Sequence, residues 1–278
     1  MSLAVRSLMH RFLIAATALL MAPALAHASR CVALAENVPP YKALIQYASL
    51  QPEEVRITYV GHSSYRIETA DGLSIVTDYA GNAGPGPVPT VVTMNRAHSS
   101  HWTQFPDPAI THVLKGWGEG EEAKAEHYLE LDNEVLIRNV TTDIRGSWDT
   151  PGRVVDGNSI FIFEVAGLCI GHLGHLHHEL SPGHIGAIGR IDILMIPVDG
   201  TYTMNQDNML RVAKELRSSI VLPMHWFGLS NLERFVAGMA TEFGVNRLPE
   251  RDFTVTLNTL PPTPQVFVPG GFLSFPSD

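Results

Sequence analysis

The first strands of the fold are marked by short stretches in which apolar and polar residues alternate. Ser64–Thr69 alternates in this way, with Tyr65 and Ile67 on one face, as a half-buried strand does. Asp71-Gly72 is a strong signal for a two-residue hairpin turn, so the strands on its two sides should pair antiparallel. The pattern predicts three strands in this region, at Val55–Val60, Ser64–Thr69 and Leu73–Asp78.

Further strands are expected where a short apolar run is bounded by turn residues. The most apolar is Ile191–Val198, whose continuous hydrophobicity is typical of a strand buried on both faces. Glycine and proline mark a loop at Gly81–Pro89, and polar residues mark another between Asp143 and Asp156. The remaining strands are expected at Pro89–Val92, Thr111–Leu114, His127–Leu131, Val135–Val140, Ser159–Val165, around Ile170, and at Phe253–Leu257.

Two helices are indicated by apolar residues at helical spacing behind a capping pattern. Thr203 and Gln206 form the first capping pattern, and Ser230 and Glu233 form the second. Gly244 is expected to end the second helix. The buried stripes are Met209, Val212, Ala213 and Leu216 in the first helix, and Leu232, Phe235, Val236, Met239 and Phe243 in the second.

The order of these elements predicts the fold class. Hairpin strands come first and strand–helix alternation follows, which favours an α/β fold in which sheets are packed in a sandwich flanked by helices. A short helix is expected around Tyr41–Ser49, and the proline-rich end from Pro261 is expected to be an irregular strap.

Histidines are concentrated at the ends of three of the apolar runs. Loops at strand ends are where α/β folds place chemistry, and neutral imidazole is the commonest metal ligand, suited to zinc, iron, copper and nickel. Convergence of the three strand ends would therefore create a metal site, whereas any one pair alone would be read as surface histidines. The clustered residues are His98 and His101, then His172, His175, His177 and His178, and finally His225.

Residues 1–28 have the features of a secretory signal peptide. Arg6 and Arg11 accompany an apolar run from Phe12 to Met21, and Ala24–Ala28 offers small residues for cleavage. The run is too short to span a bilayer comfortably, although an uncleaved anchor is the alternative. We expect residues 29–278 to form one periplasmic or secreted domain with no membrane partner after cleavage.

Charge and cysteine content add to this picture. The net charge is −9, and removal of Arg6 and Arg11 with the signal peptide would take it to −11. Nucleic acids and anionic membranes need basic patches, so neither is expected as a partner. In an oxidising compartment Cys31 and Cys169 either form a disulfide, or Cys169 remains a buried thiol in its strand.

From Ile57 to Leu257 the chain resembles the metallo-β-lactamase fold superfamily, most closely its lactonase-like and phosphodiesterase-like hydrolases. The resemblance implies an αββα sandwich of two mixed β-sheets flanked by helices. Val91–His101 takes the place of the family's metal motif H-x-H-x-D-H, and Ile170–His178 resembles its H-L-G-D-L-G-H segment. The other matching segments are Tyr59–Glu68 for the opening hairpin, Val76–Asp78 for the T-D turn, and Ile196–Gly200 and Pro223–His225 for the closing strands.

The metal motif departs from the family pattern. Arg96 stands where the family has its first histidine, Ser100 where it has aspartate, and His175 where it has a bridging aspartate. Two divalent ions about 3.5–4 Å apart repel each other, and a neutral imidazole cannot bridge them as a carboxylate does, so one ion, zinc, is expected. By resemblance the ligands are His98 and His172 for the first metal position, His101 and His225 for the second, and His175 between them.

The resemblance also implies catalytic roles for Asp78 and His178. Asp78 would accept a hydrogen bond from a ligand imidazole or assist the attacking water, unless it only forms a turn. His178 maps onto a pocket histidine, and His62 would support the site or a turn. Arg96 would hold a substrate anion or pair with a nearby carboxylate.

The expected function is that of an exported metal-dependent hydrolase. A metal-bound water would attack an ester, lactone or phosphoester bond of a small-molecule substrate. Two alternatives remain open at this point. The protein is a non-catalytic binding module that has kept the fold, or its all-histidine site binds copper or iron for chemistry other than hydrolysis.

Overall fold

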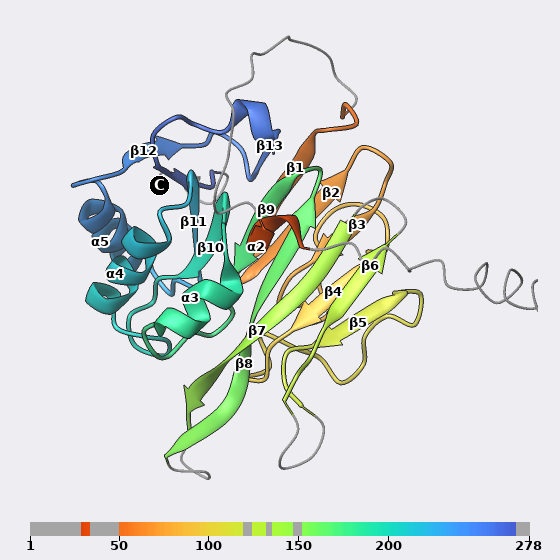
Figure 1. Ribbon diagram of the computed structural model, residues 1–278, viewed down its shortest axis with the longest axis horizontal. Coiled ribbons are helices and arrows are strands. Elements are labelled where there is room, and N and C mark those ends of the chain that lie inside the picture. Colours follow the sequence, from red (N-terminus) through yellow and green to blue (C-terminus); the bar gives the residue numbers. More distant parts are fainter. Residues whose placement is uncertain (1–28, 34–49, 119–123, 132–134, 147–151, 271–278) are drawn as a thin grey trace, which may run out of the picture.

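Two mixed β-sheets face each other in the computed structural model, which describes residues 29–33, 50–118, 124–131, 135–146 and 152–270 (Figure 1). The first sheet has the strand order β13-β1-β2-β3-β4-β5, and the second has the order β12-β14-β11-β10-β9-β8-β7-β6. The sandwich of two mixed sheets predicted from the sequence is therefore confirmed.

The strands of the first sheet are β1 (Val55–Gly61), β2 (Ser64–Thr69), β3 (Ser74–Val76), β4 (Val91–Met94), β5 (His112–Lys115) and β13 (Asp252–Val255). The strands of the second sheet are β6 (Tyr128–Leu131), β7 (Val135–Arg145), β8 (Arg153–Val165), β9 (Leu168–His172), β10 (Ile193–Pro197), β11 (Ile220–Met224), β12 (Gly244–Arg247) and β14 (Gln265–Val268). The helices are α2 (Arg30–Ala33), α3 (Pro182–Ile188), α4 (Gln206–Leu216), α5 (Leu229–Met239) and a 3₁₀ turn (Leu257–Thr259).

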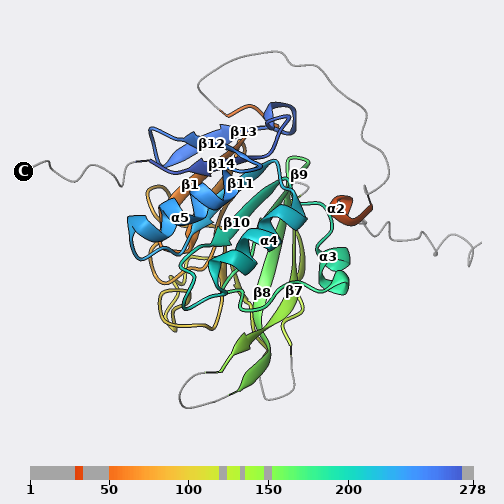
Figure 2. The same cartoon turned by 90° about the vertical axis from the view of Figure 1, so that its left-hand side faces the viewer.

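Alternation along the central strands divides their apolar side chains between two cores. On β8, Phe161 and Phe163 lie in the core between the sheets, whereas Ile160 and Ile162 lie in the core beneath the helices. Figure 2 views that helical face and shows α4 and α5 in front of the strands of the second sheet. Strands β9, β10 and β11 are therefore covered on both faces, which explains their continuous apolar sequences.

The two predicted long helices are present, but their boundaries differ from the predictions. Asn205 caps α4, because Thr203 instead donates its hydroxyl to Asp199. Helix α5 begins after Gly228 without a side-chain cap and ends at Met239, so Gly244 starts β12 rather than ending the helix. The predicted stripes face the core, because burial of apolar surface outweighs the local capping preferences.

Two predicted irregular segments contain strand. The loop expected between Asp143 and Asp156 is shorter, because the antiparallel pairing of β7 with β8 continues to Arg145 and Arg153 beyond a bulge. This polar ribbon extends beyond the body of the molecule (Figures 1 and 2) and lacks the apolar alternation that signals a strand. The C-terminal strap contains β14, which pairs in parallel with β11 and β12.

The short helix α2 is tied to the second sheet. Cys31 and Cys169 form a disulfide with their Cα atoms 6.0 Å apart, which resolves the two alternatives left by the sequence. The backbone amide of Arg30 donates to Glu164 on β8 (2.8 Å), and that of Arg190 donates to the carbonyl of Cys31 (3.1 Å). The predicted signal peptide and the helix around Tyr41–Ser49 lie outside the described residues. Within the described part, no helix has the length and hydrophobicity needed to cross a membrane.

Parallel strands bring the histidine-bearing loops together. In the first sheet β3, β4 and β5 run parallel, and in the second β9, β10 and β11 do. The carboxyl ends of such strands lie along one side of each sheet, which we call the carboxyl edge. The histidines of the sequence follow these strand ends.

Candidate metal centre

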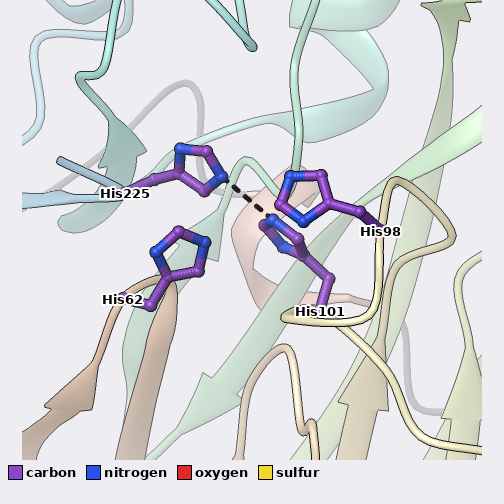
Figure 3. Close-up of side chains that lie close together, drawn as sticks. All are labelled: His62, His98, His101 and His225. Atoms are coloured by element: carbon purple, nitrogen blue, oxygen red, sulfur yellow. Dashed lines mark hydrogen bonds between the residues drawn. The ribbon is translucent and has the colours of Figure 1, made fainter. Parts of the chain in front are cut away.

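Four histidines from both sheets converge at this edge (Figure 3). His62 lies in the turn between β1 and β2, His98 and His101 lie in the loop after β4, and His225 directly follows β11. One ring nitrogen from each lies within 4.8 Å of the others. We call these residues the four-histidine group.

Carboxylates fix the proton positions of two of these rings. Nδ1 of His101 lies 2.5 Å from Asp78 Oδ2, and Nδ1 of His225 lies 3.1 Å from Asp199 Oδ1. An ionised carboxylate only accepts hydrogen bonds, so both Nδ1 atoms carry the proton when the rings are neutral. Each Nε2 is then a lone-pair donor available to a metal, as in the carboxylate–histidine–metal arrangements of known metal sites.

The two available nitrogens face each other at a distance suited to a shared ion. Nε2 of His101 and Nε2 of His225 are 3.1 Å apart, the contact drawn as a dashed line in Figure 3. Two lone pairs at this distance repel unless a cation or a proton lies between them. Nitrogens held at about 2.0–2.1 Å from one tetrahedral zinc would be about 3.3 Å apart, so the spacing fits a single transition-metal ion.

The other two histidines of the group are held neutral. Burial, followed by the charges of His225, His101 and His98, lowers the pKa of His62 from 6.5 to about 3. Burial and the charges of His101 and His225 lower the pKa of His98 to about 4. Nε2 of His62 is buried without a hydrogen-bond partner among the described residues. An unpartnered neutral imidazole nitrogen next to three others fits a metal ligand.

Each orienting carboxylate is itself held by several donors. Burial alone would raise the pKa of Asp78, but His172, His101 and a hydrogen bond from Asn95 lower it to about 2. Burial would likewise raise the pKa of Asp199, but hydrogen bonds from His225 and Thr203 lower that pKa below its ordinary range. Both carboxylates therefore stay ionised and keep the histidine protons on Nδ1.

Backbone strain is concentrated at the site. Six non-glycine residues in the described part have positive φ angles, and three of them are His62 (52°), Asp78 (44°) and His225 (55°). A left-handed conformation costs an L-residue on the order of 1–2 kcal/mol. The surrounding packing holds these side chains in an unfavourable backbone conformation that aims them at one point.

His175 adjoins the four-histidine group. Its Nε2 lies 3.2 Å from Nε2 of His98, and its ring centroid lies 4.9 Å from that of His101 and 5.0 Å from that of His225. Its Nδ1 contacts Nε2 of His177 (2.6 Å), and Nδ1 of His177 accepts from the backbone amide of Arg145 (2.9 Å). His175 therefore reaches the centre from the second sheet, as the sequence leads one to expect.

His172 is not brought into the group. Its Nε2 lies 2.8 Å from the carbonyl of Ser63, and its Nδ1 accepts from the amide of Gly174 (3.1 Å). Both ring nitrogens are thus engaged by backbone, so His172 links β9 to the turn that carries His62. In the structure His172 supports the turn that carries His62 and is not one of the grouped histidines.

The remaining predicted residues lie around the centre. Asp78 orients His101 through one carboxylate oxygen and accepts from Asn95 through the other, so neither oxygen faces open space. His178 is half-buried, and its Nε2 lacks a partner among the described residues. Arg96 is exposed in the loop after β4. Ser100 lies 2.7 Å from Nδ1 of His98 and orients that ring.

Two residues have a larger role in the centre than the sequence predicts. His62 is expected only to support the site or a turn, whereas the structure places it in the four-histidine group. Like the other clustered histidines, it follows a strand, β1. Asp199 directly follows the apolar run that forms β10, and an acidic residue at that position is the same kind of signal.

Comparison with known proteins identifies relatives of this chain. A family model described as the beta-lactamase superfamily domain matches residues 56–225. A UPF0173 metal-dependent hydrolase of Methanosphaera stadtmanae is 28% identical over 212 residues, covering 66% of this chain and 88% of the relative. One of Opitutus terrae is 26% identical over 194 residues, covering 62% and 85%.

A solved structure agrees with these matches. A candidate zinc-dependent hydrolase of the metallo-β-lactamase superfamily from Thermotoga maritima superimposes with a TM-score of 0.57 at 26% identity, covering 78% of this chain and 98% of the other. The family model spans more than half of the chain, and the two-sheet fold agrees with it. The chain therefore belongs to the metallo-β-lactamase superfamily.

Proposed function

We propose that this protein is an exported metal-dependent hydrolase that acts on an ester, lactone or phosphoester bond of a small molecule. The four-histidine group, with two of its protons fixed by carboxylates, is the observation that carries the proposal. Family membership and relatives named as metal-dependent hydrolases support it.

The ion would be held by His62, His98, His101 and His225, with His175 beside them. A divalent transition metal bound there would act as a Lewis acid and lower the pKa of coordinated water toward neutrality. Neutral nitrogen donors suit zinc, with copper or iron as the other candidates. Asp78 and Asp199 would keep Nε2 of His101 and His225 free of protons throughout the reaction.

A single ion is favoured over a pair. Family sites with two ions need bridging negative charge to offset repulsion across about 3.5–4 Å. Here Asp78 and Asp199 are occupied by His101 and His225, and the cluster found among the described residues contains no carboxylate. We therefore expect about one ion per chain.

Export is supported by the disulfide between Cys31 and Cys169, because disulfides persist mainly in oxidising compartments. Mature protein recovered from outside the cytoplasm should have an N-terminus between His27 and Cys31, as measured by intact mass. An N-terminus at Met1 would contradict the cleavage that we propose.

The metal and the activity can be tested together on the mature protein from its native host. Elemental analysis should give about one zinc per chain, and chelation should lower the melting temperature and abolish hydrolysis in a screen of esters, lactones and phosphoesters. Saturating metal at a thousandfold excess over Kd stabilises a fold by about 4 kcal/mol, so the shift should be easy to measure.

Matched variants separate the candidate functions. His101→Ala should lose metal, whereas His127→Ala should retain it, because Nε2 of His127 contacts the carbonyl of Lys115 outside the centre. Absence of metal from the wild type would favour the non-catalytic binding module. Bound copper or iron without hydrolysis would favour the non-hydrolytic alternative.

A further inference from the structure

Two large aromatic side chains are exposed beside the four-histidine group. Tyr202 is 61% exposed and Phe227 is 59% exposed, although each lies within two residues of a buried one, Thr203 and His225 respectively. Their ring centroids are 5.1 Å apart. Phe227 lies 5.3 Å from His225 and 5.7 Å from His62, and Tyr202 lies 6.4 Å from His98.

The backbone that carries Tyr202 is fixed from two directions. Asp199 accepts hydrogen bonds from the amides of Thr201 (2.8 Å), Tyr202 (2.5 Å) and Thr203 (3.2 Å). Nη2 of the Arg145 guanidinium faces the carbonyl oxygens of the same three residues and shares its two N–H groups among them, at 2.7–2.8 Å. The exposed ring is therefore displayed by a rigid loop, and the carboxylate that holds the loop also orients His225.

Phe227 is displayed by the other segment that supplies the centre. Its neighbour Trp226 stacks on Tyr59 with ring centroids 5.0 Å apart, which anchors the chain just after His225. The side chain of Phe227 is left outside this stack and next to the histidines. Two rings from separate loops thus form one apolar wall, which we call the Tyr202–Phe227 wall.

We propose that the Tyr202–Phe227 wall binds an aromatic or similarly flat apolar group of the substrate next to the bond that is hydrolysed. This inference rests on the proposed function, because it assigns the wall to the same centre. Rigid aromatic surfaces bind planar groups at low entropic cost, and exposed apolar patches beside polar centres mark ligand sites.

The test uses two hydroxamates that share a metal-chelating head group and differ in one substituent. Benzohydroxamate carries a phenyl ring and acetohydroxamate carries a methyl group. We expect calorimetric titration of the metal-loaded mature protein to show benzohydroxamate binding at least about tenfold more tightly. Tyr202→Ala and Phe227→Ala should each remove most of this preference and leave acetohydroxamate binding unchanged.

Matched variants control for the loss of an exposed ring and for the hydroxyl group. Tyr128→Ala removes a tyrosine of similar exposure, 58%, on β6 and should keep the preference. Tyr202→Phe retains the ring and should keep the preference for benzohydroxamate. Sedimentation of the wild type and of each variant shows whether the wall instead joins two copies of the chain.

The outcomes distinguish this proposal from the proposed function. Equal binding of the two hydroxamates would overturn the proposal that the wall binds an aromatic group, and so would a preference that persists in both alanine variants. Neither result would contradict the proposed metal centre. Failure of benzohydroxamate to bind a metal-loaded protein would also overturn it, as would a dimer that dissociates in Tyr202→Ala. Absence of metal, with neither hydroxamate bound, would instead remove the proposed function.

Discussion

At the scale of single residues, the centre depends on which ring nitrogen of each histidine carries the proton. Asp78 and Asp199 perform the same task for His101 and His225, although they come from different sheets. A carboxylate in this position orients the ring and raises its basicity as a ligand. Removal of that carboxylate should weaken metal binding without removing a ligand.

Asp78→Asn tests this role with a nearly isosteric side chain. Asparagine tolerates the left-handed backbone at this position, so the fold should be retained. The metal Kd should rise about 10–100-fold, measured by competition with a chromophoric chelator. A Kd within about twofold of the wild type would show that Asp78 only forms a turn.

His62 and His172 should respond in opposite ways. His62→Ala removes a ring with an unpartnered Nε2, so metal affinity should fall at least about tenfold and metal-free stability should change by less than about 1 kcal/mol. His172→Ala breaks two buried hydrogen bonds and should lower metal-free stability by about 2–4 kcal/mol. Urea unfolding of the metal-free variants and metal titration measure the two quantities. The reverse pattern would assign His172 to the ligands.

The sequence predicts much of the centre at this scale. His98, His101, His175 and His225 follow apolar runs, and the parallel strands bring those ends together. The place of His172 could not be read in the same way. Its engagement depends on the carbonyl of Ser63, which is distant in sequence and becomes a neighbour only in the folded chain.

At the scale of elements, α2 depends on covalent and polar links rather than on its own helical stability. A helix of four residues is too short to be stable alone. The disulfide to β9 and the contact of Arg30 with Glu164 hold it against the second sheet. Arg138 pairs with Glu164 as well, so this carboxylate serves two elements.

Cys31→Ser should therefore destabilise the fold without changing the metal centre. The disulfide closes a loop with a sequence separation of 138, for which the loss is expected to be about 2–5 kcal/mol. Thermal unfolding with and without a reductant measures the effect, since reductant should lower the wild-type melting temperature and leave the variant unchanged. Loss of metal from the folded Cys31→Ser variant would contradict the expectation that the disulfide and the metal centre are independent of each other.

At the scale of the whole molecule, the centre lies at the seam between two sheets. His62, His98 and His101 come from the first sheet, and His225 comes from the second. The core between the sheets could be anticipated from the period-two alternation. The polar ribbon of β7 and β8 could not, because pairing continues there without a buried face.

Acid should destabilise the metal-free protein over a defined pH range. The pKa values of His62 and His98 are about 3 and 4 in the folded state and 6.5 ordinarily, so the unfolded chain binds more protons below pH 6.5. Stability should therefore fall as pH decreases from about 6.5 to 4, measured by urea midpoints with chelator present. The His62→Gln/His98→Gln variant should show a shallower decline. An equal decline would mean that these two rings are not held neutral by the fold.

The left-handed backbone at His62 has a consequence for how this chain can change over generations. Glycine adopts that conformation without steric cost, and the half-buried His62 ring has no hydrogen bond at Nε2 to lose, so selection for thermal resistance alone should favour glycine there. Selection for metal retention should keep histidine. A library randomised at this codon and sorted under each regime would yield divergent populations, and the thermally selected one would have lost a ligand of the centre in exchange for a more relaxed chain.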